Sequence, residues 1–562
     1  MISAIRYYYT IKNLHPIQVI YRLKYILKRN LYERNGSFFF KRLEKKFKKE
    51  TTKINADLKF VLNERTYYLD EINEVLENKI SFLNHKINFD QKIVWHSEEL
   101  NQGTRLWKLN LNYHEFLFDI AFKYKETKDQ KYIDYIENTV SEWFVQNPLG
   151  TKGYGKDNWN SYAISLRLIS WIKIYTLVGR EFTKKFESFF LKLLWIQAEF
   201  LSQNPELDIL GNHLIKNWKA LIWCKHFFST SRFDKEIRSV EKFVYPQFSD
   251  FGMHEEYSPM YAGIVLEDLM EVFLFQKNNE KLENLIHKQF NNVRLLSNVN
   301  QYLFFNDSVD NNGIQFDQLN DFYYKIFKRE FDQKEEVFDI NGFIGVKTDK
   351  EHLVFDCAKV VGGNQPGHVH CDALSFEYFR GNEKIFTNSG TYEYNSGSRR
   401  EYSRATESHN VLQYDDFNQS EVWSSFRMAR EASVDYNTKC LEPDNLDIEG
   451  TVKGYDFSNE ITHKRRLIKK ENTIIIKDTL IASTDRKSKL FFHLTPDFNF
   501  INGKIVEKET NRKVATIQTS NSYEVVSTEF YPEFGIWKEK ETMIVCDIAP
   551  NEEVTTEIVF NE

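Results

Sequence analysis

Two histidines stand one residue apart in the segment "QPGHVHCDALSF", and an aspartate follows them. They are His368 and His370, with Asp372 two residues further on, just after the glycine-rich run "VGGN". Positions two apart on an extended segment lie on the same side, so both imidazoles share a face. Such a pair could bind one metal ion together. Alternatively, one histidine could bind a metal ion while the other acts as a proton-transfer base. A metal would need a further donor, for which His409, Asn388 or Asp372 is available.

Three more polar clusters contain side chains that could take part in catalysis or binding. They are "GNHLIKNW", "GMHEEYSPMY" and "SHNVLQYDD". Asn212 is either a ligand-binding amide or a cap of the helix that follows it, since Asn caps helices well. Tyr257 and Tyr261 are either hydroxyls of a site or half-buried aromatics. His409, as a lone histidine, has a structural reading beside the functional one.

Tryptophan is concentrated in the first part of the chain, where eight of the ten precede residue 224. Flat aromatic faces can stack on sugar rings, although most tryptophans at helical spacing belong to a core. Trp171 and Trp195 lie on apolar faces and are predicted to be core. Trp107 and Trp159 are flanked by Asn, Lys and Asp, which favours a polar cleft.

The residues from about 110 to 325 have the spacing of helices. The segment "SYAISLRLISWIKIYTLVG" predicts an amphipathic helix with one buried face, begun by Asn160 or Ser161 and ended by Gly179. Similar helices are expected in "FESFFLKLLWIQAEFL", "HLIKNWKALIWCKHFF" and "YAGIVLEDLMEVFLF". Short turns between them predict antiparallel helical pairs.

The pattern changes after the charged connector "KREFDQKEEVFDING". Short alternating runs rich in Val, Ile, Phe and Thr predict strands in "GFIGVKT", "HLVFDCAKV", "ENTIIIKDTLI", "KLFFHLTPDF", "TMIVCDIAP" and "TEIVFNE". Helices followed by strands indicate an α+β chain with separate α and β domains rather than a βαβ sheet.

Length and composition limit the class of protein. The 562 residues predict two or three domains, and 41% hydrophobic residues supply large cores. A net charge of -6 argues against a nucleic-acid binder. The five cysteines show no close pairing and are expected to be free thiols.

The N-terminal stretch has scattered Lys and Arg, no apolar core and no small-residue cleavage site, so it does not resemble a signal peptide. A cytoplasmic location is therefore expected, with the periplasm as the alternative. No stretch is long and apolar enough to span a bilayer. The basic, aromatic N-terminal segment is either a peripheral contact with a membrane surface or a solvated helix docked on the main domain.

Several separated motifs together resemble the heparinase II/III family of polysaccharide lyases. They are "GNHLIKNWKAL", "GMHEEYSPMY" and the long segment from "GHVHCDALSF" through "SGTYEYN" and "SRATESHN" to "VWSSFR", in the family's order. The resemblance covers roughly residues 90 to 560. It implies an incomplete (α/α) toroid followed by an antiparallel β-sandwich, with the active site in the cleft between them. The predicted domains are an N-terminal basic and aromatic helical segment (1–89), the toroid (90–330) and the heparinase II/III-like β-sandwich (338–562).

The resemblance implies β-elimination at a uronic acid within an acidic polysaccharide. This reaction needs donors that neutralise the uronate carboxylate, a base for the C5 proton and an acid for the leaving oxygen. Asn212 resembles the carboxylate-binding amide, with His213 as the alternative. Tyr261 resembles the tyrosine that protonates the leaving oxygen, and His368 the histidine that assists proton abstraction. The expected substrate-binding side chains are His213, Tyr257, Arg404, Trp107 and Trp159.

The resemblance also implies one divalent metal ion, most often zinc, with a structural role. His370 and His409 match the metal-binding histidines, and Asn388 stands where the family commonly has Asp before "SGTY". A neutral amide is a weaker ligand, which lowers the expected metal affinity. Ala262 stands where a histidine is common. For Arg404, a structural salt bridge is the alternative to binding an acidic sugar.

The leading hypothesis is thus a polysaccharide lyase acting on a uronate-containing glycan. One alternative is a non-catalytic glycan-binding or scaffolding protein of polysaccharide biosynthesis, which Asn388 favours. The other is a glycoside hydrolase on the same architecture, which needs two opposed carboxylates. Glu255, Glu256 and Asp307 are available for that role, but the histidine pair would then have no function.

Overall fold

The computed structural model describes residues 4–47, 72–96, 99–310, 312–329, 336–361, 364–457, 460–484, 486–546 and 548–561. The chain forms two compact units. The first, here called the β unit, consists of Met1–Leu14, Phe248–Leu266 and Asn284–Glu562. The second, the helical unit, consists of His15–Gln247 and Glu267–Glu283. Among the described residues, no helix is both long and apolar enough to cross a membrane.

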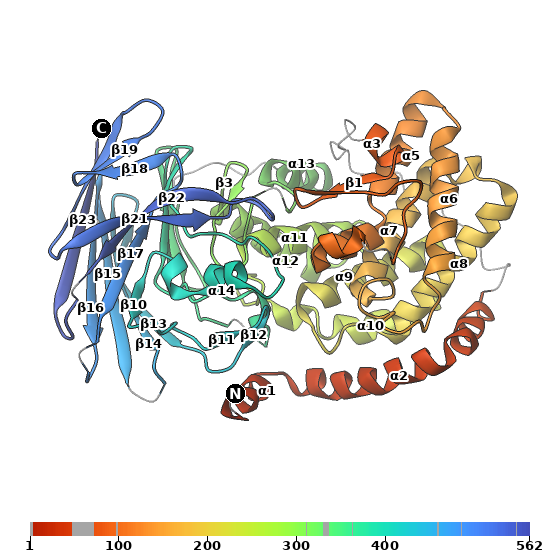
Figure 1. The fold of residues 1–562 in the computed structure, drawn as a ribbon, viewed down its shortest axis with the longest axis horizontal. Coiled ribbons are helices and arrows are strands. Elements are labelled where there is room, and N and C mark those ends of the chain that lie inside the picture. Colours follow the sequence, from red (N-terminus) through yellow and green to blue (C-terminus); the bar gives the residue numbers. More distant parts are fainter. Residues whose placement is uncertain are drawn as a thin grey trace. The chain divides into compact units, whose positions relative to one another are not determined.

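In the described part of the helical unit most elements are helices, together with a two-stranded hairpin (Figure 1). Its elements in chain order are α2 (Pro16–Glu44), α3 (Ile72–Leu76), β1 (Lys79–Phe82), β2 (His85–Asn88), η4 (Glu99–Gln102), α4 (Arg105–Tyr113), α5 (Phe116–Thr127), α6 (Lys131–Gln146), α7 (Ser161–Val178), η5 (Gly179–Glu181), α8 (Lys184–Gln203), α9 (Gly211–Phe227), α10 (Asp234–Glu241) and η6 (Tyr245–Gln247). The helices α11 (Pro259–Phe273) and α12 (Glu280–Leu295) pass from one unit to the other.

The predicted helix of residues 161–178 is confirmed as α7. The Asn160 side chain accepts hydrogen bonds from the backbone N–H groups of Tyr162 and Ala163, and Gly179 is the C-cap. The helix differs from the prediction in its burial. Ile164, Ile169 and Ile174 are buried on different sides, so α7 is an interior helix rather than one with a single buried face.

Among its described residues, the β unit contains three larger antiparallel sheets, drawn in green to blue in Figure 1. The eight-stranded sheet has the order β13 (Ser433–Glu442), β14 (Asn445–Gly454), β15 (Ile461–Lys470), β16 (Thr473–Ile481), β23 (Glu553–Phe560), β20 (Lys513–Thr519), β19 (Lys504–Glu507), β18 (Phe498–Ile501). The five-stranded sheet has the order β5 (Glu336–Ile340), β6 (Phe343–Lys347), β7 (Glu351–Asp356), β8 (Phe376–Arg380), β9 (Glu383–Phe386). The four-stranded sheet has the order β10 (Leu412–Tyr414), β17 (Ser488–His493), β22 (Lys538–Val545), β21 (Tyr523–Phe530).

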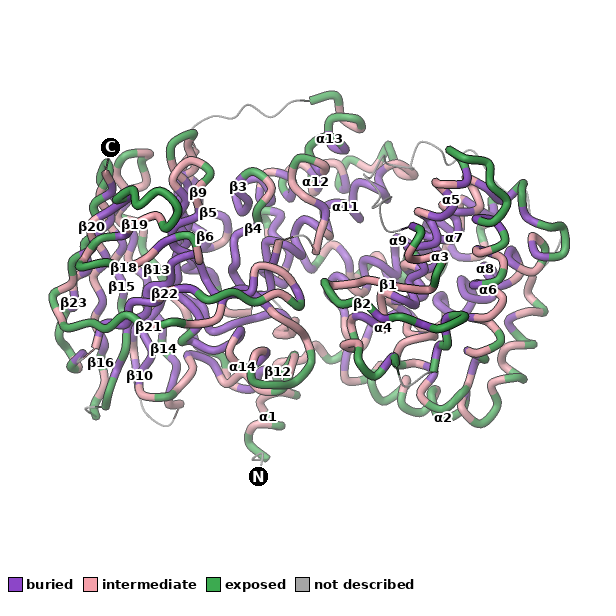
Figure 2. The backbone as a smooth tube through the Cα atoms, turned by 45° about the horizontal axis from the view of Figure 1, so that its top comes forward, coloured by how far each residue is buried: buried purple, intermediate pink, exposed green. Residues whose placement is uncertain are grey.

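These sheets share one apolar core. Burial alternates along β14 and β16, so each strand turns one face inward. The inward side chains of the large sheet, such as Ile448 and Leu467, join Phe355 and Phe376 of the five-stranded sheet and Phe492 of the four-stranded sheet. Figure 2 shows this buried interior in purple with exposed turns in green. Each predicted strand run contains a strand.

The β unit also contains helices and short strands outside these sheets, of which η7 and α14 carry polar residues described next. They are α1 (Ala4–Lys12), β3 (Ser297–Asn298), β4 (Gln301–Tyr302), α13 (Phe316–Phe327), η7 (Pro366–His368), α14 (Ser398–Arg404), η8 (Thr406–Ser408), β11 (Val422–Trp423) and β12 (Arg427–Met428). The start of α11 and the loop after β4 also belong to this unit, although the helical pattern of the sequence extends through them. The "GMHEEYSPMY" and "GHVHCDALSF" motifs therefore lie in one body.

Candidate active site

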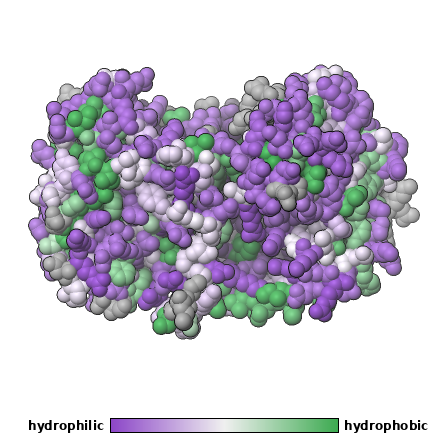
Figure 3. All heavy atoms as spheres, in the orientation of Figure 1, coloured by the Kyte–Doolittle hydropathy of each residue, from purple (hydrophilic) through white to green (hydrophobic). Residues whose placement is uncertain are grey.

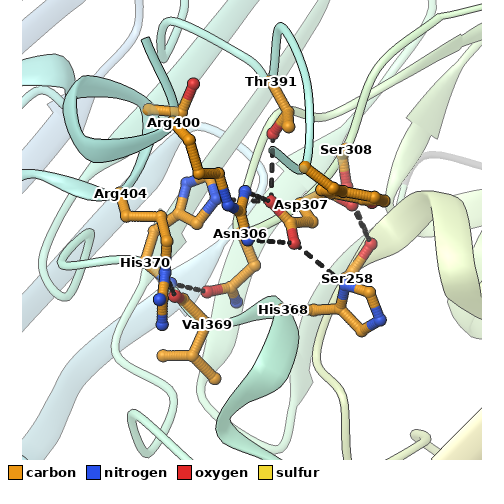
Figure 4. A network of polar contacts seen from close by, with 12 residues as sticks. Ser258, Asn306, Asp307, Ser308, His368, Val369, His370, Thr391, Arg400 and Arg404 are labelled. Carbon is orange, nitrogen blue, oxygen red and sulfur yellow. Dashed lines mark hydrogen bonds and ion pairs between the residues drawn. The ribbon is translucent and has the colours of Figure 1, made fainter. Parts of the chain in front are cut away.

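A buried aspartate, Asp307, is the centre of the polar cluster (Figure 4). It lies in the loop that follows β4, next to Asn306, whose φ of 55° is in the left-handed region that Asn tolerates. The carboxylate accepts hydrogen bonds from His368 Nδ1 at 2.9 Å and His370 Nε2 at 2.8 Å. Arg400 donates to both carboxylate oxygens, and Thr391 Oγ1 donates at 3.1 Å. One carboxylate therefore holds both histidines of the motif.

These donors fix the charge of Asp307. Burial by itself would raise the pKa of this carboxyl, but the Arg400 guanidinium and the hydrogen bonds from His368 and His370 outweigh it. They hold the pKa of Asp307 well below its usual range. Asp307 is therefore ionised at neutral pH and can only accept hydrogen bonds.

His368 is held with one ring nitrogen turned to Asp307. Because an ionised carboxylate only accepts, His368 Nδ1 carries the proton of the neutral ring, and Nε2 is left with its lone pair. Its backbone is tied to the same loop, since Asp307 N donates to His368 O at 3.0 Å. A histidine oriented by a buried carboxylate, with an unprotonated Nε2, has the arrangement of a general base.

His370 and His409 face each other, each with the ring nitrogen that has a lone pair. His370 Nε2 donates to Asp307, so its Nδ1 has a lone pair. His409 Nδ1 lies 2.7 Å from the carbonyl oxygen of Ala405, which places the proton there and leaves Nε2 with a lone pair. These two nitrogens are 3.2 Å apart. Burial lowers the pKa of His370 to about 4 and that of His409 well below its usual range.

Two neutral lone pairs at this distance repel each other, and a cation between them would remove the repulsion. Two nitrogens bound to zinc at about 2.0–2.1 Å in a tetrahedral site lie roughly 3.3 Å apart. His370 and His409 therefore fit two ligands of one metal ion.

A carboxylate completes this group. The ligand atoms of His370, His409 and Asp372 all lie within 4.8 Å of one another, and all three residues are buried. Asp372 Oδ2 also accepts a hydrogen bond from the Asn306 backbone at 2.7 Å. Burial, and then the nearby Asp307 and Glu377 carboxylates, raise the pKa of Asp372 to about 6.

Asn388, the third metal ligand expected from the resemblance, has its oxygen turned to other partners. Its Oδ1 accepts from Ser375 Oγ at 2.7 Å. Its Nδ2 is buried and has no hydrogen-bond partner among the described residues. The carboxylate that groups with the two histidines is Asp372, two residues after His370. Asn388 as a ligand stays a prediction.

Tyr261 lies against His368 at the start of α11. The two ring centroids are 4.0 Å apart, and the Tyr261 hydroxyl is 3.0 Å from the Tyr394 hydroxyl. Ser258 Oγ accepts from the Tyr261 backbone at 3.2 Å and donates to Asp307 O at 2.7 Å, which ties this helix start to the Asp307 loop. Burial, and then Tyr394, raise the pKa of Tyr261 well above its usual range, so its hydroxyl keeps its proton.

Arg404 and Tyr257, expected to bind substrate, are engaged with the protein. Arg404 is buried and donates to backbone carbonyls, among them Val369 O at 3.0 Å. It therefore supports the His368–His370 segment, and its partners are carbonyl groups rather than the salt bridge considered from sequence. Tyr257 is also buried, with its hydroxyl hydrogen-bonded to Asn341 and its ring edge against Phe343.

Trp107 and Trp159, expected in a polar cleft, are instead packed inside the helical unit. The Trp107 indole N–H donates to His85 O and that of Trp159 to Asn147 O, each at 2.9 Å. Both rings are almost fully buried, so neither offers a face to a sugar. The polar residues next to them, such as Lys108 and Asn158, are half-buried, so local polarity did not indicate the burial of the two rings.

Asn212 and His213 belong to the helical unit, in the first turn of α9. Asn212 is buried. His213 Nδ1 lies 3.1 Å from Glu206 Oε1, and its ring packs on Tyr162 with centroids 4.4 Å apart.

The sequence prediction missed Arg400 and Tyr394, and considered Asp307 only as a hydrolase carboxylate. Arg400 and Arg404 are four apart in the run "SRREYSR" of α14, so they share one helix face. That spacing was a usable signal for two buried guanidinium groups. The loop of Asp307 had no such signal, because its partners come from distant segments.

Comparisons with solved structures find the same fold. A crystal structure of heparinase III matches with a TM-score of 0.75 at 16% identity, over 89% of this chain and 86% of that one. The heparan sulfate lyase HepC from Pedobacter heparinus matches with a TM-score of 0.57 at 15% identity, over 94% and 88%. A chondroitin AC lyase from Streptomyces coelicolor A3 matches with a TM-score of 0.54 at 7% identity, over 88% and 78%. The predicted fold class is thereby confirmed.

Sequence comparisons agree with the motifs. The heparin-sulfate lyase of Bacteroides thetaiotaomicron is 24% identical over 226 residues, which are 38% of this chain and 31% of that protein. The match thus spans about a third of that relative's length. The model "Heparinase II/III N-terminus" matches residues 24–339, and "Heparinase II/III-like, C-terminal" matches residues 334–559. Matched in both halves, the chain belongs to the heparinase II/III family.

Proposed function

We propose that this protein is a polysaccharide lyase that cleaves a uronic-acid-containing acidic polysaccharide by β-elimination. The observation that carries the proposal is the pair of Tyr261 and His368, whose rings lie 4.0 Å apart in the β unit. The tyrosine holds a proton to donate, and the histidine has an Nε2 lone pair to accept one. An elimination requires an acid and a base of this kind close together.

In the proposed reaction, His368 Nε2 removes the proton from C5 of the uronate. The electrons of the C5–H bond form the C4–C5 double bond, and the C4–O bond breaks. The Tyr261 hydroxyl gives its proton to the departing glycosidic oxygen. The reaction also needs a donor to the uronate carboxylate, whose neutralisation makes C5 acidic enough to lose its proton. Asn212, with His213 as the alternative, stays a prediction for this role.

The residues proposed to hold a metal ion, zinc by preference, are His370 and His409, with Asp372 as the carboxylate. When bound, the ion would tie the His368–His370 segment to the end of η8 and so support the local structure. The proton transfers are assigned to His368 and Tyr261 alone.

Hydrolysis by two carboxylates is less well supported. Asp307 accepts hydrogen bonds from Arg400 and both histidines, so it is neither free to donate a proton nor to attack a sugar. Glu255, whose pKa burial and then Glu256 raise to about 8, could act as an acid, but its neighbour Glu256 is not an opposed partner. A non-catalytic glycan-binding role would leave the Tyr261–His368 pair without a purpose.

The test is incubation of the full chain with a panel of acidic polysaccharides, including heparan sulfate, chondroitin sulfate and alginate. A lyase produces an unsaturated uronate whose ultraviolet absorbance rises with time. Tyr261→Phe serves as the control, because background absorbance from a contaminant would persist in it. Product fragments without absorbance would establish hydrolysis instead, and no fragments from any acidic polysaccharide would favour the binding role.

A further inference from the structure

Helix α2 is docked on the helical unit by one face. Gln18 Nε2 donates to Ile209 O at 2.8 Å, Lys28 Nζ donates to Gln203 O at 2.6 Å, and the Tyr25 hydroxyl donates to Pro205 O. Tyr32 is buried, with its ring 5.6 Å from that of Phe200. The helix is therefore held firmly along its length by contacts with the end of α8 and the loop after it.

The opposite face of α2 is apolar and exposed. Ile20, Leu23, Leu27 and Leu31 have exposed fractions of 58%, 62%, 67% and 52%. Their spacing of three and four residues places them in one stripe along the helix. Figure 3 shows hydrophobic side chains in green along the lower edge, where Figure 1 places α2. Single exposed leucines are ordinary, but a stripe of this length marks a binding surface.

The charge of α2 is opposite in sign to that of the chain. The helix carries seven Lys and Arg against two Glu, a net charge of +5, whereas the whole chain has a net charge of -6. Lys24 is exposed beside the apolar stripe, and Arg34 is exposed in line with it, three residues after Leu31. An apolar stripe bordered by cations is the pattern of a helix that lies in the interface of an anionic bilayer.

We propose that the apolar stripe of α2, Ile20–Leu23–Leu27–Leu31, binds the surface of an anionic lipid bilayer with the helix parallel to it. The leucines enter the boundary of the acyl chains, while Lys24 and Arg34 meet lipid phosphates. Docking by the opposite face keeps the helix ordered before it binds, so no folding cost is paid at the membrane. A second copy of the chain is less suited, because it would bring a second set of cations against the first. The proposal does not depend on the proposed lyase activity.

The test is flotation of the full chain with vesicles of phosphatidylcholine, alone or with about one third phosphatidylglycerol. Wild type should float with the anionic vesicles and stay below with the neutral ones. Leu23→Gln/Leu27→Gln should lower the partition coefficient by about tenfold or more, because each leucine loses its transfer to the acyl boundary. Lys24→Gln/Arg34→Gln should lower it by about 25-fold, at roughly fivefold for each cation near an anionic surface.

The matched control is Val145→Gln in α6, where the valine has an exposed fraction of 75%. It removes an exposed apolar side chain of the same unit and should leave flotation unchanged. Thermal melting of every variant should match wild type, since the altered side chains are exposed. The proposal is refuted if wild-type protein does not float with anionic vesicles. It is also refuted if the α2 variants float with them as well as wild type does. Self-association in lipid-free sedimentation that the Leu23→Gln/Leu27→Gln variant abolishes would assign the stripe to a second copy instead.

Discussion

Asp307→Asn is the substitution that best separates the chemistry proposed here from simple packing. The change keeps the shape of the side chain and removes its charge. Asn offers one acceptor oxygen, whereas Asp307 accepts from His368 on one oxygen, from His370 on the other, and from Arg400 on both. The amide nitrogen would face a donor, and the buried Arg400 would lose its counter-ion.

Two losses of different size are expected from this change. Removing one partner of a buried ion pair costs about 3–5 kcal/mol of folding free energy. Arg400 keeps Ser425 O as an acceptor at 2.8 Å, so the lower end, about 3 kcal/mol, is expected. Turnover should fall further than stability alone explains, because His368 loses the acceptor that fixes its tautomer. A wrong tautomer in the serine protease triad costs about 10⁴-fold, so a loss of about 10²–10⁴-fold is expected here.

The chain contains a matched control in Asp478 of β16. This buried carboxylate accepts from His463 at 2.6 Å and from Arg465 at 2.7 Å, so it has the same kinds of partner in the sheet core. Asp478→Asn should cost a similar free energy of unfolding. It should leave turnover per folded molecule near wild type, because neither of its partners contacts His368 or Tyr261. Arg465 also donates to Leu374 O and Asn410 O, near the proposed metal ligands, so metal content is measured in this variant as well.

The free energy of unfolding of each variant is measured by urea titration. Turnover is measured separately, without urea and at a temperature where both variants are folded, on the polysaccharide that the panel identifies. Asp307→Asn should lose stability and turnover, and Asp478→Asn stability only. Wild-type turnover in folded Asp307→Asn would refute the assignment of His368 as a base oriented by Asp307. Equal loss of turnover in both variants would reduce Asp307 to a structural group.

Three further outcomes are expected. Tyr261→Phe should keep the fold and polysaccharide binding while turnover falls by about 10²-fold or more, and Tyr523→Phe, at an exposed tyrosine, should match wild type in the same absorbance assay. Elemental analysis should find metal in wild type and in His368→Ala but not in His370→Ala. The His370→Ala variant should also melt at a lower temperature, because bound metal stabilises the folded state. Metal retained in His370→Ala would contradict the ligand assignment. Burial holds the pKa of His352 well below its usual range, so unfolded chains take up a proton that folded chains exclude as pH falls below about 6.5. Stability should therefore decrease from pH 7 toward pH 5, and His352→Gln should make that decrease shallower in urea titrations at each pH.

Elements and local motifs were predictable from sequence because their signals are local. The helical spacing of apolar residues around Trp171 predicts the helix and both of its caps. The alternation of apolar and polar residues predicts the strands of the β unit. His368 and His370 were recognised as a pair because both lie within one short segment. Their separate roles follow from different partners, which the sequence does not display.

The parts that escaped prediction depend on contacts between distant segments. Asp307 meets His368 across 61 residues of chain and Arg400 across 93, so no periodicity links them. Trp107 and Trp159 have polar sequence neighbours, yet their indole N–H groups are satisfied by backbone carbonyls of other segments, which allows full burial. Local polarity predicts exposure poorly for a side chain that can find such a partner.

Asp307 also limits how far the two histidines can act separately. One oxygen orients the proposed base, His368, and the other fixes the His370 tautomer that turns Nδ1 toward His409. Loss of the His370 ring would leave that second oxygen with Arg400 and Thr391 as its donors among the described residues, so the carboxylate would be held less firmly. A looser carboxylate would orient His368 less well even though His370 takes no part in proton transfer. A moderate loss of turnover in His370→Ala is thus compatible with a structural role, whereas only His368→Ala should remove the base itself.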